Sequence, residues 1–144
     1  VPLIINDRLD ICLAVDAAGV HLGQTDLPCS EARRILGAEK IIGVSAATPE
    51  EAAKAQSDGA DYLGVGAVFA TSTKTNTRPV TAETIRAIRS AVDIPFVVIG
   101  GVNSENISGL HGLGINGAAV ISAIISQPDI TAAARKMRQA AERL

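Results

Sequence analysis

A hydroxyl-rich turn with a single lysine stands in the middle of the chain. It reads Ala70-Thr71-Ser72-Thr73-Lys74 and follows the apolar segment 61–69. Two further turns, at 99–102 and 120–123, contain glycine or serine and follow later apolar runs. Backbone N–H groups together with a nearby cation are what a phosphate group needs. The three turns therefore predict a site for an anion, most simply a phosphate.

Two acidic residues near the start of the chain, Asp7 and Asp26, indicate that a metal belongs to the same site. Mg²⁺ prefers oxygen ligands and commonly takes one or two carboxylates plus substrate phosphates. Each residue also has a simpler interpretation. Asp7 could cap the helix that follows the first apolar run, and Asp26 could be a turn residue. We interpret the pair as metal ligands.

The composition is that of a folded globular domain. The chain has 144 residues, 47% hydrophobic content and a net charge of −2, so we expect one domain over residues 1–144. Scattered basic residues and 2% aromatic content argue against a nucleic-acid partner. No apolar run reaches the roughly 18 residues of a membrane span, and no secretory leader is recognisable.

The cysteines and histidines carry no chemistry of their own in this interpretation. Cys12 and Cys29 are expected to be reduced packing residues of a cytoplasmic protein. A zinc site is disfavoured because they and His21 lack the close ligand pairs of such sites. His21 lies in an apolar run and is expected in the core or behind the site, whereas His111 is expected to be exposed.

Apolar runs alternate with helical patterns along the whole chain. Most of the runs lack polar alternation, as expected of parallel strands buried on both faces. Helices are predicted to begin at Thr48, where Pro49 and Glu51 complete a capping box, at Thr81, at Asn103 or Ser104, and at Asp129. The predicted strands are Leu3–Ile5, Val20–Leu22, Ile41–Val44, Tyr62–Val65, Phe96–Ile99 and Ala118–Ile121.

Two α/β architectures compete for this pattern. An open doubly wound sheet would usually carry a glycine-rich loop after its first strand, but here Asn6-Asp7-Arg8 follows that strand. Phosphate-type loops after the last two strands are typical of a TIM-type (β/α)8 barrel. We therefore predict such a barrel, with about six of its eight βα units in this chain and two missing from the front. Apolar edge strands at 3–5 and 119–121 predict an incomplete view of a longer protein or pairing with a second copy, a homo-oligomer.

Six blocks of sequence, in order and over essentially the whole chain, resemble the thiamine-phosphate synthase (thiamine-phosphate pyrophosphorylase) family. Each block alone is weak, but six in the family's order and spacing are strong. The blocks are 3–8 (LIINDR), 19–26 (GVHLGQTD), 42–46 (IGVSA), 59–74, 99–101 (IGG) and 120–124 (VISAI).

The resemblance implies a βα barrel that joins a hydroxymethylpyrimidine diphosphate to a thiazole phosphate. The products would be thiamine phosphate and pyrophosphate, and Mg²⁺ would be the cofactor. Asp7 and Asp26 would then hold Mg²⁺ against the diphosphate. Asn6 would contact the pyrimidine, and Ser45 would contact its diphosphate-bearing end.

The same resemblance implies the remaining site residues. Lys74 would bind the pyrophosphate, which makes Ser45 and Lys74 the expected catalytic residues. Thr71, Ser72 and Thr73 would bind the thiazole phosphate, and Gly101, Ile121 and Ser122 would cradle its phosphate. The nucleophile is a thiazole nitrogen with no proton to lose, so no general base is required.

The chain also departs from the family pattern. A Gln-x-Arg-x-Lys motif that binds the pyrimidine diphosphate precedes these blocks in the family and is absent here. Ala47 stands where many members, and the related thiazole tautomerases, carry a histidine that is catalytic in the tautomerases. Three functions therefore stay open: the synthase, a metal-independent thiazole phosphate tautomerase or related barrel isomerase, and a non-catalytic chain that only binds thiazole phosphate.

Overall fold

Six parallel strands form one curved sheet in the computed structural model, which describes residues 1–70, 79–142 and 144. The sheet order is β1-β2-β3-β4-β5-β6, and each strand pairs in parallel with the next. The strands are β1 (Ile4–Asn6), β2 (Gly19–Leu22), β3 (Ile41–Ala46), β4 (Tyr62–Gly66), β5 (Phe96–Ile99) and β6 (Gly117–Ala119). The helices are α1 (Leu9–Ala14), α2 (Cys29–Leu36), α3 (Pro49–Ser57), α4 (Ala82–Ala91), η1 (Ile107–Leu110, a 3₁₀ helix), α5 (Ser122–Ile125) and α6 (Ile130–Ala141).

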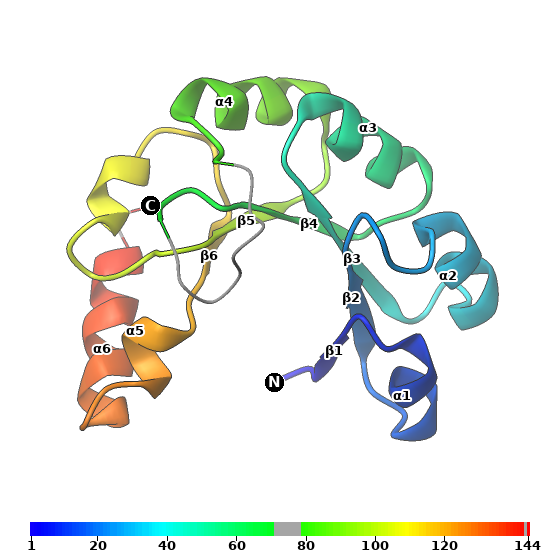
Figure 1. The fold of residues 1–144 in the computed structure, drawn as a ribbon, viewed down its shortest axis with the longest axis horizontal. Coiled ribbons are helices and arrows are strands. Elements are labelled where there is room, and N and C mark those ends of the chain that lie inside the picture. The colour runs from blue at the N-terminus through cyan, green and yellow to red at the C-terminus, as the bar shows by residue number, and fades with distance from the viewer. Residues whose placement is uncertain (71–78, 143) are drawn as a thin grey trace.

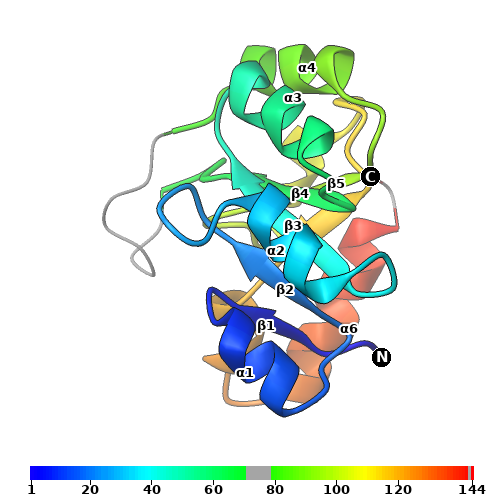
Figure 2. The ribbon, with the colours of Figure 1, turned by 90° about the vertical axis from the view of Figure 1, so that its right-hand side faces the viewer.

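The sheet bends into an arch whose outer, convex side carries the helices (Figure 1). Turning the molecule by a quarter shows α4, α3, α2 and α1 one above another along that side (Figure 2). Strand order equals chain order throughout, whereas a doubly wound sheet reverses its order at a switch point. The prediction of a partial (β/α)8 barrel is therefore confirmed. As predicted, β1 and β6 are the two edges of the sheet, and pairing with a second copy stays a prediction.

The core lies between the sheet and its outer helices. Along the four central strands, β2 to β5, alternate residues point outward into this core and are almost completely buried; examples are Val20, Ile42, Leu63 and Phe96, each 0% exposed. The intervening residues face the inside of the arch, and Ile99 there is 36% exposed. The inner face is thus available for polar groups, while the outer face holds the fold together.

Three helix starts are confirmed by side-chain caps. The Thr48 hydroxyl accepts from the Glu51 N–H and the Thr81 hydroxyl from the Thr84 N–H. The Asp129 carboxylate accepts from the Ala132 N–H at the start of α6. Each oxygen satisfies one of the N–H groups that have no partner within the helix.

The helix expected from Asn103 or Ser104 is wrong. In this region the structure has only the 3₁₀ helix η1, and a turn and a bend follow over residues 111–113. The Asn103 side chain accepts from the N–H groups of Glu105 and Asn106, which closes a side-chain turn that competes with a helix. The short helix α5 was not expected either, because the pattern indicated a loop after the last strand.

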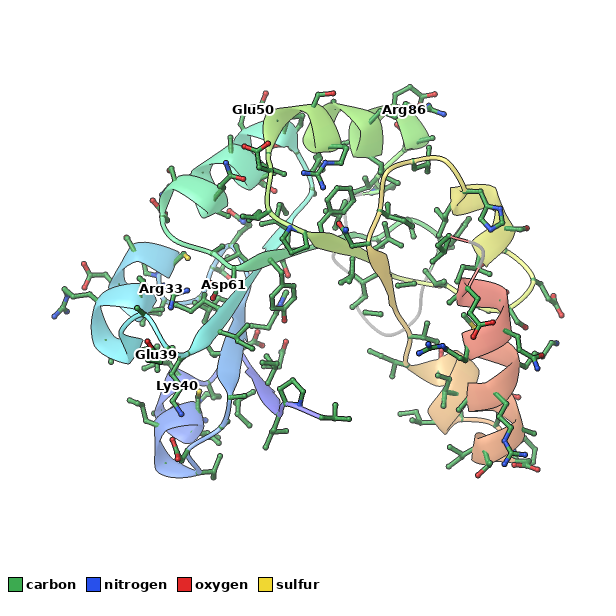
Figure 3. All side chains as sticks on the ribbon, turned by 180° about the vertical axis from the view of Figure 1, so that it is seen from behind. Arg33, Glu39, Lys40, Glu50, Asp61 and Arg86 are labelled. Atoms are coloured by element: carbon green, nitrogen blue, oxygen red, sulfur yellow. The ribbon has the colours of Figure 1, made fainter. Side chains whose placement is uncertain are left out.

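Arg33 of α2 ties together the amino ends of β3 and β4. Its guanidinium donates to the carbonyl oxygens of Gly37, Lys40 and Gly59 at 2.7–3.1 Å. It also pairs with the Asp61 carboxylate at 2.6 Å, and Figure 3 shows the two side chains pointing toward one another. These contacts lie at the edge of the sheet that serves stability in βα barrels.

Replacing Arg33 by methionine is expected to lower the free energy of unfolding by about 1–3 kcal/mol, because half-buried carbonyls lose their donors. Arg34→Met is the matched control on the same helix. The Arg34 side chain is 71% exposed and pairs only with Glu31 among the described residues, so its loss should change stability by less than about 0.5 kcal/mol. Urea unfolding measures the stability of both variants. Equal losses of stability would contradict the role of Arg33 in joining the amino ends of β3 and β4.

Candidate functional site

The predicted site residues that the structure describes lie toward the carboxyl edge of the sheet. Asn6 ends β1, and Ser45 is the next-to-last residue of β3. Gly101 follows β5, and Ser122 follows β6 after a short connection. All strands run parallel, so their carboxyl ends meet at one edge. That edge is where βα barrels carry their active sites.

Asp7 turns the chain sharply at the end of β1. Its φ is 63°, a left-handed conformation that few residues other than glycine adopt. Its N–H donates to the His21 carbonyl at 2.8 Å, which joins it to the neighbouring strand β2. Arg8 occupies the N-cap position of α1 and makes no side-chain cap. The simpler interpretation, in which Asp7 is the helix cap, is therefore wrong.

Asp26 closes the turn after β2. One carboxylate oxygen, Oδ2, accepts from the Gly23 N–H at 2.6 Å, and the Asp26 N–H donates to the Gly23 carbonyl at 3.3 Å. The turn role of Asp26 is thus confirmed. The hydrogen bond from Gly23 uses Oδ2 of the carboxylate, and Oδ1 takes no part in it. Turn and metal roles are compatible, because a carboxylate has lone pairs on both oxygens.

The described residues hold no group of three or more histidine, cysteine, aspartate or glutamate side chains arranged for a metal. A cage made wholly of protein ligands is therefore absent from that part of the chain. Mg²⁺ does not need one, since it usually keeps waters and shares one or two carboxylates with substrate phosphates. Asp7 and Asp26, on neighbouring strand ends, have the chemistry for such a shared site.

The loop after β5 lies against the residues that lead into the hydroxyl-rich turn. Gly100 and Gly101 have φ values of 99° and 65°. A Cβ at Gly101 would lie 2.4 Å from the Ala70 carbonyl oxygen, so only glycine permits this approach. Thr71, Ser72, Thr73 and Lys74 come directly after Ala70 in sequence. They lie outside the described residues, and their roles stay predictions.

Asparagine side chains hold the Gly101 loop in shape. The Asn106 amide donates through Nδ2 to the Gly101 carbonyl at 2.9 Å and accepts through Oδ1 from the Asn103 N–H at 2.8 Å. This pins the Gly101 carbonyl to its own loop. Asn103 was expected only as a helix cap and Asn106 was not singled out, so sequence reasoning missed this supporting role.

Ile121 and Ser122 stand at the start of the short helix α5. Ile99 of β5 pairs with Ala119 of β6, so both loops leave the sheet at the same edge. Both Ile121 and Ser122 are exposed. The N-cap, Ile121, supplies no side-chain cap, which suits a helix start whose N–H groups meet a phosphate. The role of Ile121 and Ser122 in holding a phosphate stays a prediction.

His21, Ser45 and Tyr62 form a hydrogen-bonded row on the inner face of the sheet. The two ring nitrogens of His21 lie 3.0 Å from the Tyr62 and Ser45 hydroxyl oxygens. Burial raises the pKa of Tyr62 above its ordinary value. These contacts agree with the expectation that His21 lies in the core or behind the site, whereas Tyr62 was not singled out because it looked like part of an apolar strand.

The sequence model of the family described as "Thiamine monophosphate synthase" matches residues 1–124. The chain belongs to this family. Curated members include the thiamine-phosphate synthase of Ruminiclostridium cellulolyticum, 58% identical over 137 residues, and that of Moorella thermoacetica, 55% identical over 141 residues. These matches cover 95% and 97% of this chain but 65% and 67% of the relatives. The chain thus spans about two thirds of the length of those family members.

A solved structure also supports membership of the thiamine monophosphate synthase family. Thiamine phosphate pyrophosphorylase from Pyrococcus furiosus superposes with a TM-score of 0.88 at 42% identity, over 96% of this chain and 66% of that one. A 3-hexulose-6-phosphate synthase superposes with a TM-score of 0.69 at 22% identity. The second likeness shows the fold alone. No helix among the described residues is long and apolar enough to cross a membrane.

Proposed function

We propose that this chain carries the transfer site of a thiamine-phosphate synthase. The reaction joins 4-amino-2-methyl-5-(diphosphooxymethyl)pyrimidine to a thiazole phosphate and gives thiamine phosphate and pyrophosphate. One observation carries the proposal: acidic, hydroxyl and glycine residues from successive βα units converge on one edge of the sheet. Family membership supports the same reaction.

The residue types suit a substitution at a heteroaromatic methylene carbon. The bond from this carbon to the diphosphate oxygen breaks, and the oxygen keeps the electron pair. The thiazole nitrogen then forms the new carbon–nitrogen bond. Charge develops on the leaving oxygens, so donors and cations aimed at them lower the barrier. Ser45 on the inner face and the predicted Lys74 are the residues that would meet this charge.

Asp7 and Asp26 would hold Mg²⁺ beside the diphosphate. The fit rests on the chemistry of the donors: two carboxylates, one with an oxygen outside its turn, at the ends of neighbouring strands. The bound ion would neutralise charge on the leaving pyrophosphate. Ala47 supports the synthase over a thiazole tautomerase, since a catalytic histidine of that branch has no counterpart there.

The thiazole phosphate would bind across the loops after β5 and β6. Gly101, Ile121 and Ser122 would cradle its phosphate with backbone N–H groups, and the predicted Thr71, Ser72 and Thr73 would complete the site. We also propose a cytoplasmic location. Cys12 and Cys29 are free and buried, which suits a reducing compartment.

Replacing Asn106 by aspartate tests the support of the phosphate loop. Aspartate keeps the acceptor for the Asn103 N–H but loses the donor to the Gly101 carbonyl and places negative charge beside it. We expect affinity for thiazole phosphate to fall about tenfold, the equivalent of one hydrogen bond. Isothermal titration calorimetry with thiazole phosphate measures the change.

Asn116→Asp is the matched control for this variant. The Asn116 side chain accepts from the Phe96 N–H at 3.0 Å, at the opposite end of strand β5. Aspartate retains that acceptor, so affinity should stay within twofold of the parent, roughly the scatter of one surface substitution. Equal losses in both variants would mean that added negative charge, and not the Asn106 contact, weakens binding.

Separate incubations distinguish the three possible functions. The chain is given thiazole phosphate alone, both substrates with Mg²⁺, and both substrates with EDTA, and products are separated by chromatography. The synthase forms thiamine phosphate only in the second incubation. A changed thiazole phosphate in the first would mean a tautomerase, and binding of thiazole phosphate without any product would mean a non-catalytic chain. Either of these results would overturn the proposal.

A further inference from the structure

The row formed by His21, Ser45 and Tyr62 joins three neighbouring strands on the inner face of the sheet. His21 lies on β2, Ser45 on β3 and Tyr62 on β4. His21 Nε2 lies 3.0 Å from Ser45 Oγ, and His21 Nδ1 lies 3.0 Å from Tyr62 Oη. All three side chains are half-buried. The histidine therefore links a phenol on one side to the hydroxyl of a predicted catalytic residue on the other.

Two glycines make room for this row. His21, Gly43 and Tyr62 share one register across β2, β3 and β4, so the two rings meet over Gly43. A Cβ at Gly43 would lie 2.2 Å from Tyr62 Cζ, and one at Gly64 would lie 2.9 Å from His21 Cε1. Any side chain at either position would displace a ring. The strand residues thus fix where both rings sit.

The direction of the hydrogen bonds follows from the chemistry of the three groups. A neutral imidazole donates from one nitrogen and accepts at the other. A phenol is more acidic than an aliphatic hydroxyl and is the better donor. This difference favours donation from Tyr62 to His21 Nδ1, which would leave the proton of the imidazole on Nε2. The Nε2–H then donates to Ser45 Oγ.

A serine hydroxyl that accepts from an imidazole N–H keeps its own proton for another partner. On the inner face, a bound substrate would be that partner. Burial keeps Tyr62 protonated across the physiological range, because it raises the pKa of the phenol. In this row Tyr62 thus donates to His21, His21 donates to Ser45, and the Ser45 hydroxyl is left to donate into the site.

We propose that Tyr62 is a positioning residue that holds His21 as its Nε2–H tautomer, so that Ser45 directs its hydroxyl proton at the leaving oxygen of the diphosphate substrate. The role of Ser45 rests on the proposed function, whereas the tautomer of His21 does not. Gly43 and Gly64 belong to the same device, because they seat the rings of Tyr62 and His21.

Nitrogen NMR of the imidazoles tests the tautomer directly. The chain has only two histidines, and the exposed His111 is an internal reference. At a pH where His21 is neutral, long-range ¹H–¹⁵N correlations should show the proton on Nε2 in the parent chain. Tyr62→Phe should shift the Nδ1 resonance of His21 to that of a nitrogen without a donor, with His111 unchanged. A parent chain with the proton on Nδ1 would overturn the proposal.

Kinetics of Tyr62→Phe test the consequence for Ser45. The phenyl ring still fits over Gly43, so only the hydroxyl is lost. We expect kcat to fall about tenfold, the equivalent of one hydrogen bond, with KM for thiazole phosphate unchanged. An unchanged kcat, or an equal effect on KM for thiazole phosphate, would overturn the positioning role.

Two glycine variants distinguish loss of the Tyr62–His21–Ser45 row from a general disturbance of the sheet. Gly43→Ala should reproduce both effects of Tyr62→Phe, because its methyl group displaces the phenol. Gly117→Ala adds a methyl group on the inner face of β6, where the nearest atom is 3.6 Å away, and should change neither readout. Equal effects in both glycine variants would contradict the device. The expected tautomer in a chain that forms no thiamine phosphate would overturn the proposed function and leave the hydrogen-bond assignment standing.

Discussion

Replacing Asp26 by asparagine is expected to lower kcat/KM for the synthase reaction at least about 100-fold. Asparagine Oδ1 can still accept from the Gly23 N–H, so the turn after β2 is kept. What the substitution removes is the negative charge that would hold Mg²⁺ together with Asp7. Product formation measured across a range of Mg²⁺ concentrations should show loss of affinity for the ion, with urea unfolding unchanged.

Asp129→Asn is the control for the loss of a carboxylate. Asp129 also accepts from a backbone N–H three residues away, that of Ala132 at the start of α6, and asparagine caps helices as well as aspartate does. This variant should keep the parent kcat/KM. An Asp26→Asn chain with parental activity would mean that Asp26 is only a turn residue, and the metal site would need other ligands.

Replacing Gly101 by alanine is the second change with a large expected effect. The new Cβ would lie 2.4 Å from the Ala70 carbonyl oxygen and 2.9 Å from Phe69 Cβ. Because one of these neighbours is backbone, the loop after β5 must move away from the end of β4. We expect affinity for thiazole phosphate to fall by about 10- to 100-fold, since the backbone N–H groups that would hold the phosphate lose their positions.

Gly112→Ala separates this steric effect from backbone strain. Gly101 and Gly112 have similar φ values, 65° and 71°, but nothing lies within 4 Å of a Cβ at Gly112. The left-handed conformation should cost each variant about 1 kcal/mol of stability, and the steric clash should add to this cost only in Gly101→Ala. Only Gly101→Ala should weaken binding in calorimetry, and equal affinities in the two variants would remove Gly101 from the phosphate site.

The strands could be predicted because parallel strands buried on both faces leave continuous apolar runs. Phe96–Ile99 is such a run, and its bounds agree with β5. The starts of α3 and α4 could be predicted equally well, because the Thr48 and Thr81 side chains each cap an N–H group only three residues along the chain. Interactions within a few residues are therefore visible in the sequence.

The expected helix after Asn103 failed for a local reason that propensity does not reveal. Asparagine can either cap a helix or close its own turn, and Asn103 does the second. The hydrogen-bonded row through His21 and Tyr62 could not be predicted, for a different reason. Its members are 41 residues apart and meet only because the strand register places both opposite Gly43. Register of that kind is set by the whole sheet and not by either residue.

The most direct test of the central claim is formation of thiamine phosphate by this chain, with pyrophosphate measured in the same sample. Both substrates are supplied with Mg²⁺, and a second sample receives EDTA before the substrates. We predict equal amounts of the two products with Mg²⁺ and neither with EDTA. Absence of both products with Mg²⁺, in a chain that binds thiazole phosphate, would contradict a transfer site in these residues.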